Sequence, residues 1–353
     1  MIGGAGMGHA SVDNLTPFAF GSSFAMDEDG GPLFLPILMA TFRFSASCVA
    51  VAEVPIPVNH GGEFWGEPGI SSYKYEPQTA FMKPATDIVL IGHAYPLAST
   101  ATESAVRLCV GSLEKTVRVI GDRYWVKTFG TISMTFPEPF ERIPLIYENA
   151  FGGWDRRHID PDEHRFDPRN PVGIGFRSKH GQFEEGVRLP NLEDPRYPIS
   201  NYDDTPPPAG FGFISPEWQP RASFAGTYDE TWMKERMPLL PNDFDRRFFN
   251  AASSGLVAPG YLRGDEPVLI ENASPHGTLS FNLPGVPPPQ CRVQLVGRQD
   301  AQIPMLLDTV TINTDEDLLL LLWRGYLPVQ NGPHDVVSIK ISSEGVNTPT
   351  AEG

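Results

Sequence analysis

The segment Leu33–Phe44, with the sequence LFLPILMATFRF, gives the clearest evidence of the fold class. Most of it is apolar, and at its end Phe42 and Phe44 alternate with polar residues. A period of two is typical of a β-strand that buries one face. The turn sequence DEDGGP at Asp27–Pro32 comes directly before this strand. We therefore predict a hairpin between Thr16–Ala25 and Leu33–Phe44.

Similar short apolar runs, many of them rich in β-branched residues, occur in the first and last thirds of the chain. Two pairs flank short turn sequences and predict hairpins, 105–110 with 115–120 and 309–313 with 318–323. The sequence thus predicts a mainly β fold, an antiparallel β-sandwich-like scaffold. The further strands that we predict are Asp87–His93, Ala105–Val110, Lys115–Ile120, Glu266–Glu271, Thr278–Phe281, Cys291–Gly297, Met305–Asn313 and Leu318–Trp323.

Between these groups of strands lies a long segment, residues 138–250, in which proline and glycine recur every few positions. The whole chain has 34 glycines and 36 prolines in 353 residues, well above the average content. A run such as Asp203–Gly212, DDTPPPAGFG, excludes regular structure, because each proline fixes φ and removes a backbone donor. One short helix is predicted at Thr231–Met237, after a capping box at Thr227–Glu230.

These patterns divide the chain into four parts along the sequence. We call residues 138–250 the central segment, and we expect it to be ordered but mostly irregular, with one or two short helices, since it is rich in aromatic residues. The four parts are an N-terminal β region (1–137), the central segment (138–250), a C-terminal β region (251–341) and a flexible tail (342–353).

The charge of the chain limits its partners. There are 27 Lys and Arg against 43 Asp and Glu, a net charge of −16, so phosphates would be repelled and binding to nucleic acid or an anionic membrane is not expected. The three cysteines, Cys48, Cys109 and Cys291, are too few and too scattered for a disulfide framework and are expected to be buried thiols. No signal peptide and no apolar run of membrane-spanning length is visible. We expect a cytoplasmic protein.

Sequence patterns for catalysis and cofactor binding are weak. HIDPDEH places potential metal ligands at His158, Asp160, Asp162, Glu163 and His164, but a solvated acidic loop is the better interpretation, because the histidines are six positions apart with a proline between them. The serine context Ser253–Gly255 has the composition of a turn. No nucleotide-binding loop is present, and we predict no catalytic residue, no metal and no cofactor.

A series of short motifs, in a fixed order, is the most specific feature of the sequence. They begin in the first third with Pro84–Ile88 (PATDI) and Gly92–Ala94 (GHA). The central segment and the residues that follow it then contain Tyr147–Asp155 (YENAFGGWD), Asp167–Phe176 (DPRNPVGIGF), Leu189–Pro195 (LPNLEDP), Pro208–Gly212 (PAGFG), Ala225–Asp229 (AGTYD), Pro238–Asp245 (PLLPNDFD) and Phe248–Ala252 (FFNAA).

This ordered series resembles a bacterial family long labelled a domain of unknown function, whose members are associated with type VI secretion. The resemblance extends from about Leu15 to Val329. It implies a non-enzymatic effector adaptor, or chaperone, in the cytoplasm. Such an adaptor binds the PAAR-bearing N-terminal region of a toxic effector and helps to load it onto the VgrG spike. The family has no agreed catalytic residues, so none is carried over.

An adaptor needs a rigid surface, and aromatic and arginine side chains are favoured at the centres of interfaces. Filling gaps beneath the loops is the competing role for the same aromatic residues. Two other functions remain as alternatives, a carbohydrate-binding or carbohydrate-active β-sandwich and a metal-dependent enzyme that uses His158 and His164. The candidate interaction residues are Phe151, Trp154, Asp155, Arg156, Arg157, Asn170, Phe176, Phe211, Trp218, Tyr228, Trp232, Arg246 and Arg247.

Overall fold

The computed structural model describes residues 10–45, 48–80, 82–178 and 183–343. Its fold is mainly β, as predicted. The predicted flexible tail, 342–353, lies outside these residues except for Ser342 and Ser343. In the same ranges, no helix combines the length and the apolar character that crossing a bilayer requires.

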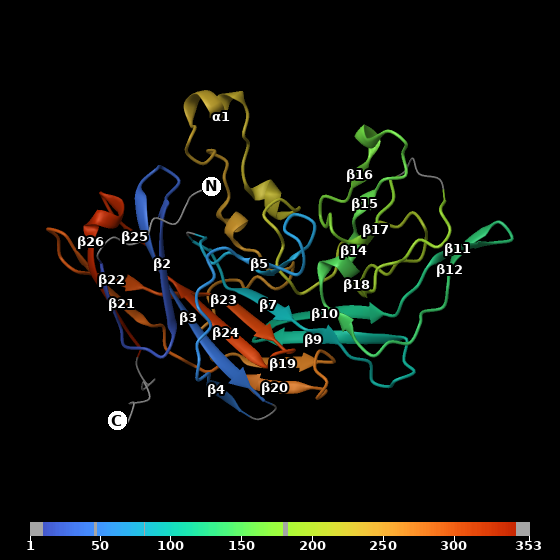
Figure 1. Cartoon of the computed structure of the whole chain (residues 1–353), viewed down its shortest axis with the longest axis horizontal. Helices are drawn as coiled ribbons and strands as arrows, with labels where there is room; N and C mark the ends of the chain where they lie inside the picture. Colours follow the sequence, from blue (N-terminus) through green and yellow to red (C-terminus); the bar gives the residue numbers. More distant parts are fainter. Residues whose placement is uncertain (1–9, 46–47, 81, 179–182, 344–353) are drawn as a thin grey trace.

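A seven-stranded sheet lies at the middle of the described chain (Figure 1). Its antiparallel core joins the first and last thirds of the sequence, since β3 pairs with β24 along seven residues. The predicted hairpins and the buried strand at residue 87 are confirmed. The strands, in spatial order, are β2 (Ala19–Met26), β3 (Pro32–Phe44), β24 (Leu318–Arg324), β23 (Leu306–Asn313) and β7 (Asp87–Ile91), with β4 (Val49–Val51) and β25 (Leu327–Pro328) also paired to β3.

Two smaller sheets complete the scaffold. Antiparallel pairing forms a five-stranded sheet of β18 (Leu192–Glu193), β10 (Leu113–Ile120), β9 (Glu103–Val110), β19 (Pro267–Glu271) and β20 (Leu279–Asn282). A mixed four-stranded sheet contains β1 (Ser11–Asn14), β26 (Val336–Ser342), β21 (Gln290–Leu295) and β22 (Ala301–Pro304).

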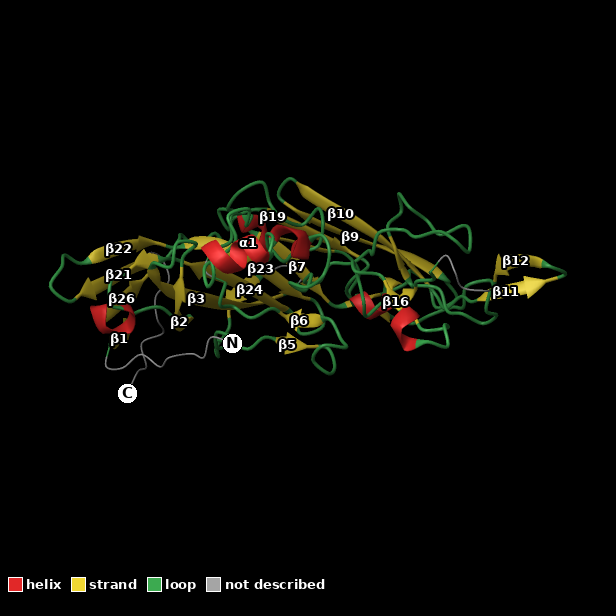
Figure 2. Cartoon of the chain, turned by 90° about the horizontal axis from the view of Figure 1, so that it is seen from above, coloured by secondary structure: helices red, strands yellow, loops and turns green. Residues whose placement is uncertain are grey.

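The seven-stranded sheet is buried on both faces. Leu38 and Leu321 face the main core, which also receives side chains from the five-stranded and four-stranded sheets. On the other face, Met39 and Leu322 pack against the segment that contains Ile56 and the strands β5 (Glu63–Phe64) and β6 (Tyr73–Tyr75). Figure 2 shows the layers, with β9, β10 and β19 on one side of β3, β24 and β23 and with β5 and β6 on the other. The arrangement is a sandwich with an additional covering layer.

The central segment is irregular, as predicted, and contains short paired strands and 3-10 turns. Within it, β14 (Phe151–Gly152) pairs with β17 (Ile174–Gly175), and β15 (Trp154–Asp155) pairs with β16 (Arg165–Phe166). Its first strand, β13 (Ile143–Pro144), pairs with β8 (His93–Ala94) of the N-terminal region, which also contains the pair β11 (Trp125–Thr128) and β12 (Thr131–Met134). The 3-10 turns are η1 (Tyr147–Asn149), η2 (Pro161–Glu163), η3 (Arg221–Phe224), η4 (Arg246–Phe249) and, near the C-terminus, η5 (Gly332–Asp335).

The helix α1 (Glu230–Glu235) is the only α-helix among the described residues, and it stands away from the sheets at the top of Figure 1. The predicted capping box at Thr227–Glu230 is wrong. Asp229 caps the helix, because its carboxylate accepts a hydrogen bond from Trp232 N at 2.8 Å. The Thr227 hydroxyl donates instead to Asp243 at 2.7 Å.

The three cysteines are free thiols in the structure. Cys291 is buried and Cys109 is partly buried, but Cys48 is exposed, so the expectation of three buried thiols is wrong for Cys48. It lies directly before β4, which begins at Val49.

Removing core side chains tests the burial of both faces. Leu321→Ala and Leu322→Ala are each expected to lower the free energy of unfolding by about 2–5 kcal/mol, because each leaves a cavity on a covered face. Urea denaturation measures both values. Val337→Ala, at an exposed position of β26, is the control and should change the free energy by less than about 0.5 kcal/mol. A loss confined to Leu321→Ala would mean that the second face is open to water.

Candidate functional site

Aspartate–arginine pairs two residues apart fix the irregular backbone of the central segment. In the pair Asp167–Arg169, for example, Asp167 Oδ1 accepts a hydrogen bond from Arg169 N at 2.9 Å, and Arg169 Nη2 donates to Asp167 Oδ2 at 2.6 Å. The carboxylate thus closes a backbone turn and binds the guanidinium at the same time. We call these pairs Asp-x-Arg clamps; they are Asp155–Arg157, Asp167–Arg169, Asp194–Arg196 and Asp245–Arg247.

Asn170 joins two of the sequence motifs. It is fully buried, and its Nδ2 donates to the carbonyl oxygens of Tyr147 at 2.8 Å and Phe151 at 3.0 Å. Gly152 has φ of +148°, and a Cβ there would lie 2.1 Å from the Asn170 carbonyl oxygen. Only glycine permits this approach. The motifs at 147–155 and 167–176 are therefore parts of one packed unit.

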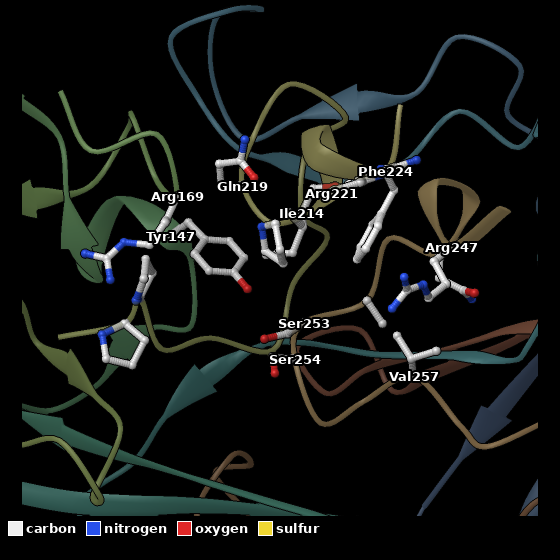
Figure 3. Close-up of a pocket in the computed structure, with 15 residues that line it drawn as sticks. Tyr147, Arg169, Ile214, Gln219, Arg221, Phe224, Arg247, Ser253, Ser254 and Val257 are labelled. Atoms are coloured by element: carbon white, nitrogen blue, oxygen red, sulfur yellow. Dashed lines mark hydrogen bonds between the residues drawn. The ribbon is translucent and has the colours of Figure 1, made fainter. Parts of the chain in front are cut away.

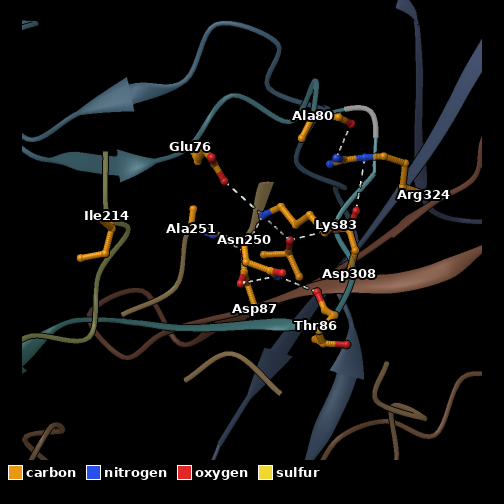
Figure 4. Close-up of polar contacts among 12 residues, drawn as sticks. Glu76, Ala80, Lys83, Thr86, Asp87, Ile214, Asn250, Ala251, Asp308 and Arg324 are labelled. Atoms are coloured by element: carbon orange, nitrogen blue, oxygen red, sulfur yellow. Dashed lines mark hydrogen bonds and ion pairs between the residues drawn. The ribbon is translucent and has the colours of Figure 1, made fainter. Parts of the chain in front are cut away.

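A buried ionic cluster attaches the central segment to the sheet (Figure 4). Lys83 Nζ donates to Asp87 Oδ2 at 2.7 Å and to Glu76 Oε2 at 3.1 Å. Glu76 Oε1 accepts a hydrogen bond from Arg221 at 2.5 Å. A second ion pair, Asp308 with Arg324, lies beside these groups on β23 and β24. The cluster therefore contains three positive and three negative side chains, and each residue is more than nine-tenths buried. Its members are Glu76, Lys83, Asp87, Arg221, Asp308 and Arg324.

In this cluster, attraction between opposite charges offsets much of the free energy that it costs to remove each charge from water. Burial disfavours the charged form of Glu76, but the positive charges of Lys83 and Arg221 outweigh it and lower the pKa of Glu76. Burial raises the pKa of Asp308, and Arg324, with its Nε 3.3 Å from Asp308 Oδ2, offsets this only in part. The cluster is therefore stable only while its members stay together.

Asp87 connects two motifs that are far apart in the sequence. Its Oδ1 accepts from Asn250 Nδ2 at 2.9 Å, and its Oδ2 accepts from Ala251 N at 2.8 Å. Arg221 adds hydrogen bonds to the carbonyl oxygens of Ile214 and Phe248, both at 2.7 Å. The motifs at 84–88 and 248–252 thus meet at one carboxylate, which holds the end of the central segment on β7.

A cavity of about 430 Å³ opens between the central segment and the sheets (Figure 3). This volume is in the range of ligand-binding pockets. The walls are mainly apolar, and the buried groups on its floor include Tyr147, Asn250 and Ser253. The cavity is lined by Tyr147, Arg169, Pro207, Pro208, Ile214, Gln219, Pro220, Arg221, Phe224, Arg247, Asn250, Ala252, Ser253, Ser254 and Val257.

Hydroxyl groups meet on one side of the cavity. The Tyr147 ring packs edge-on against Trp218, and its hydroxyl points toward Ser253 (Figure 3). No group of the described chain makes a hydrogen bond of ordinary geometry to this hydroxyl. Burial raises the pKa of Tyr147, and the nearby Ser253 offsets this only in part. Lys115, from β10, donates to Ser253 Oγ at 2.5 Å and to Ser254 O at 2.9 Å, and burial lowers the pKa of Lys115 to about 8.

The family of the chain follows from the comparison with family models. The model for uncharacterized proteins conserved in bacteria, DUF2169, matches residues 29–324. The chain belongs to this family. Neither the curated proteins nor the solved structures contain a significant match. The expected membership of a bacterial family of unknown function is confirmed, and the matched range of this DUF2169 protein includes every residue that lines the cavity.

Five of the candidate interaction residues are buried in this DUF2169 protein. Phe211 and Trp218 belong to the main core, and Phe151 belongs to a separate cluster with Trp125. These positions match the competing role, in which aromatic side chains fill the space beneath the loops. The buried set is Phe151, Asp155, Asn170, Phe211 and Trp218.

The remaining candidates reach the surface at separate places. The Trp154 ring packs against Phe166 at an interplanar angle of 33°, with ring centroids 4.6 Å apart, and the Arg156 guanidinium lies 5.0 Å from the Trp154 ring. Tyr228 is exposed beside α1, edge-on to Trp232. The exposed set is Trp154, Arg156, Tyr228, Arg246 and Arg247, and the partly buried set is Arg157, Phe176 and Trp232.

The acidic loop HIDPDEH forms local hydrogen bonds. His164 Nε2 lies 3.1 Å from the carbonyl oxygen of His158, and Asp160 caps η2 through Asp162 N at 3.0 Å. Across the described ranges, no group of three His, Cys, Asp or Glu side chains is arranged as a metal site requires.

Sequence reasoning missed the cavity, the ionic cluster and the clamps. The clamps have a readable signal, because Asp-x-Arg occurs four times between residues 155 and 247. Lys83 and Asp87 are four positions apart, a separation at which ion pairs often form. Nothing in the neighbouring sequence, however, shows that this pair is buried. The cavity has no local signal, since its walls come from distant parts of the chain.

Replacing Asp87 tests the ionic cluster. Asp87→Asn is expected to lower the free energy of unfolding by about 3–5 kcal/mol, because it leaves the buried charge of Lys83 without its nearest partner. Asp315→Asn is the control, since the exposed Asp315 forms an ion pair with the partly exposed His93 at the surface, and it should cost less than about 1 kcal/mol. Equal effects in urea denaturation would contradict the assignment.

The Asp155 clamp predicts a pH dependence. Hydrogen bonds from Arg157, and further ones from Ser178, hold the pKa of Asp155 below its usual 3.8 in the folded protein. Its stabilising contribution is therefore complete above about pH 4 and is lost as the pH falls further. We expect Asp155→Asn to be less stable than the wild type at pH 6, and the difference in unfolding free energy to shrink below pH 3.8. A difference that is constant with pH would contradict this.

Proposed function

We propose that this DUF2169 protein is a non-enzymatic adaptor of type VI secretion. It binds the PAAR-bearing N-terminal region of an effector in the cytoplasm and helps to load that effector onto the VgrG spike. The ordered motif series supports this role by resemblance. The structural observation that carries the proposal is the rigid central segment, in which clamps and buried contacts fix the loops while aromatic and arginine side chains remain exposed.

A fixed irregular surface suits protein binding for a physical reason. Side chains that are already ordered lose little conformational entropy when a partner covers them. The Trp154 ring contacts both Phe166 and Arg156, and the Tyr228 ring contacts Trp232. The exposed methionines Met233 and Met237 beside Tyr228 provide adaptable apolar contacts.

The adaptor role is tested by co-expression with any PAAR-bearing effector that is encoded in the same operon as this chain. A stable complex of defined stoichiometry in size-exclusion chromatography with light scattering is the expected result. Repeated absence of any complex with such an effector would refute the proposal.

The exposed aromatic residues should contribute to effector affinity. Trp154→Ala and Tyr228→Ala are each expected to weaken binding about tenfold or more, as buried aromatic residues do at interface centres, while the unfolding midpoint changes little because both side chains are exposed. Isothermal titration calorimetry with the purified effector region measures the affinity. Leu97→Ala, at an exposed position outside the central segment, is the control. Wild-type affinity in both variants would place the interface elsewhere.

A carbohydrate-binding function is the second candidate, and one observation favours it. A second cavity of about 300 Å³ places the exposed Trp154 beside Arg177, Glu184 and Glu185. Aromatic and charged groups around one opening suit a polar ring-shaped ligand. Binding to a glycan array that is lost in Trp154→Ala would support this function, and an array without signal would dismiss it.

A further inference from the structure

The 430 Å³ cavity has an apolar wall and a mouth without net charge. Its arginines are already paired within the chain, because Arg169 binds Asp167, Arg247 binds Asp245 and Arg221 binds Glu76. An anionic ligand would have to compete with these carboxylates. A cationic ligand would meet the guanidinium groups themselves. The charge pattern therefore favours an uncharged occupant.

The walls favour an apolar occupant of aromatic or large aliphatic size. Pro208, Ile214, Phe224 and Val257 present mainly carbon to the cavity. Protein interiors rarely keep empty spaces of this size, because unfilled volume loses dispersion contacts. A cavity that stays open in the folded chain is thus suited to filling by a ligand.

The floor adds a specific polar requirement. The Tyr147 hydroxyl is buried, points into the cavity beside Ser253 and makes no hydrogen bond of ordinary geometry in the described chain. A buried hydroxyl without a partner costs free energy, and an occupant that offers an acceptor would recover it. The occupant therefore combines an apolar group with a nearby hydrogen-bond acceptor.

We propose that this cavity anchors the effector by taking one large uncharged side chain from an extended segment of it, while a backbone carbonyl of that segment accepts a hydrogen bond from Tyr147. The inference rests on the proposed adaptor function. A peptide supplies the two required groups at adjacent positions, because every side chain is next to a backbone carbonyl.

The mouth also has the character of a protein interface. Pro207, Pro220 and Ser254 are exposed around the opening, and Arg247 covers the Phe224 ring at 4.4 Å. An apolar pocket within a polar rim that contains arginine is the usual anatomy of an anchor site.

Two variants test the anchor site on the full-length chain. Val257→Phe fills the cavity from its wall and is expected to weaken binding of the purified effector at least about tenfold, as loss of an anchor residue does. Tyr147→Phe removes only the unpartnered hydroxyl, so the fold should be as stable as the wild type or more stable. Its affinity should fall about two- to tenfold, which corresponds to the loss of one hydrogen bond. Leu97→Phe, at an exposed position outside the central segment, is the matched control and should bind normally.

A displayed library of twelve-residue peptides, panned on the immobilised full chain, identifies the occupant independently of the effector. We expect enriched peptides with one aromatic or large aliphatic residue that bind the wild type and not Val257→Phe. If the wild type binds the effector and both variants bind it equally well, the anchor site is refuted while the adaptor function stands. If the wild type binds no effector, the adaptor function itself fails.

A neutral small molecule is the other possible occupant, and it has a distinct signature. Neutral aromatic compounds that raise the melting temperature of the wild type but not of Val257→Phe, together with a peptide library that yields no enrichment, would overturn the peptide anchor in favour of a small-molecule site. Should Val257→Phe unfold, Tyr147→Phe decides alone, because an unchanged affinity in that variant refutes the proposed hydrogen bond.

Discussion

Asp87 carries a carboxylate that water does not reach, and much of the molecule is arranged around it. Its two oxygens accept hydrogen bonds from Lys83, from Asn250 and from the backbone of Ala251. A buried charge of this kind is tolerated only when such partners are all present. Because the partners come from separate parts of the chain, the carboxylate forces the central segment to dock on β7 in one register. Hydrophobic burial alone would not select that register, since it has no direction.

The rigidity of the central segment also follows from the need of polar groups to have hydrogen-bond partners, here within single loops. Loops without regular hydrogen bonding must satisfy their backbone groups by other means. The Asp-x-Arg clamps do so locally, and Asn170 does so between two motifs. The cavity survives because its surroundings are fixed from below by the ionic cluster and from the side by Tyr147 against Trp218. A loosely held segment would collapse into a space with such apolar walls.

Local patterns predicted the strands well, and they failed where distant residues compete. Leu33–Phe44 and Leu318–Trp323 have the composition and the flanking turns of strands, and both are confirmed almost to the residue. The capping box failed because Asp243, sixteen positions away, takes the Thr227 hydroxyl. Aromatic content predicted an ordered central segment, but it could not separate Phe211 in the core from Trp154 on the surface. Whether an aromatic ring faces the core or the solvent depends on how the central segment docks on the sheet. The buried ionic cluster sets this docking, and its residues are far apart in the sequence, so no local pattern predicts it.

The pairing of β3 with β24 has a consequence for how the chain is made. Arg43 and Glu316 touch in the finished sheet although they are 273 positions apart. At about 5–20 residues per second, the hairpin of β2 and β3 leaves the ribosome roughly 15–55 s before its neighbour exists. During that interval its apolar edge is open to pairing with other nascent chains. The period between the synthesis of β3 and that of β24 is therefore one in which the nascent chain can aggregate through the unpaired edge of β3.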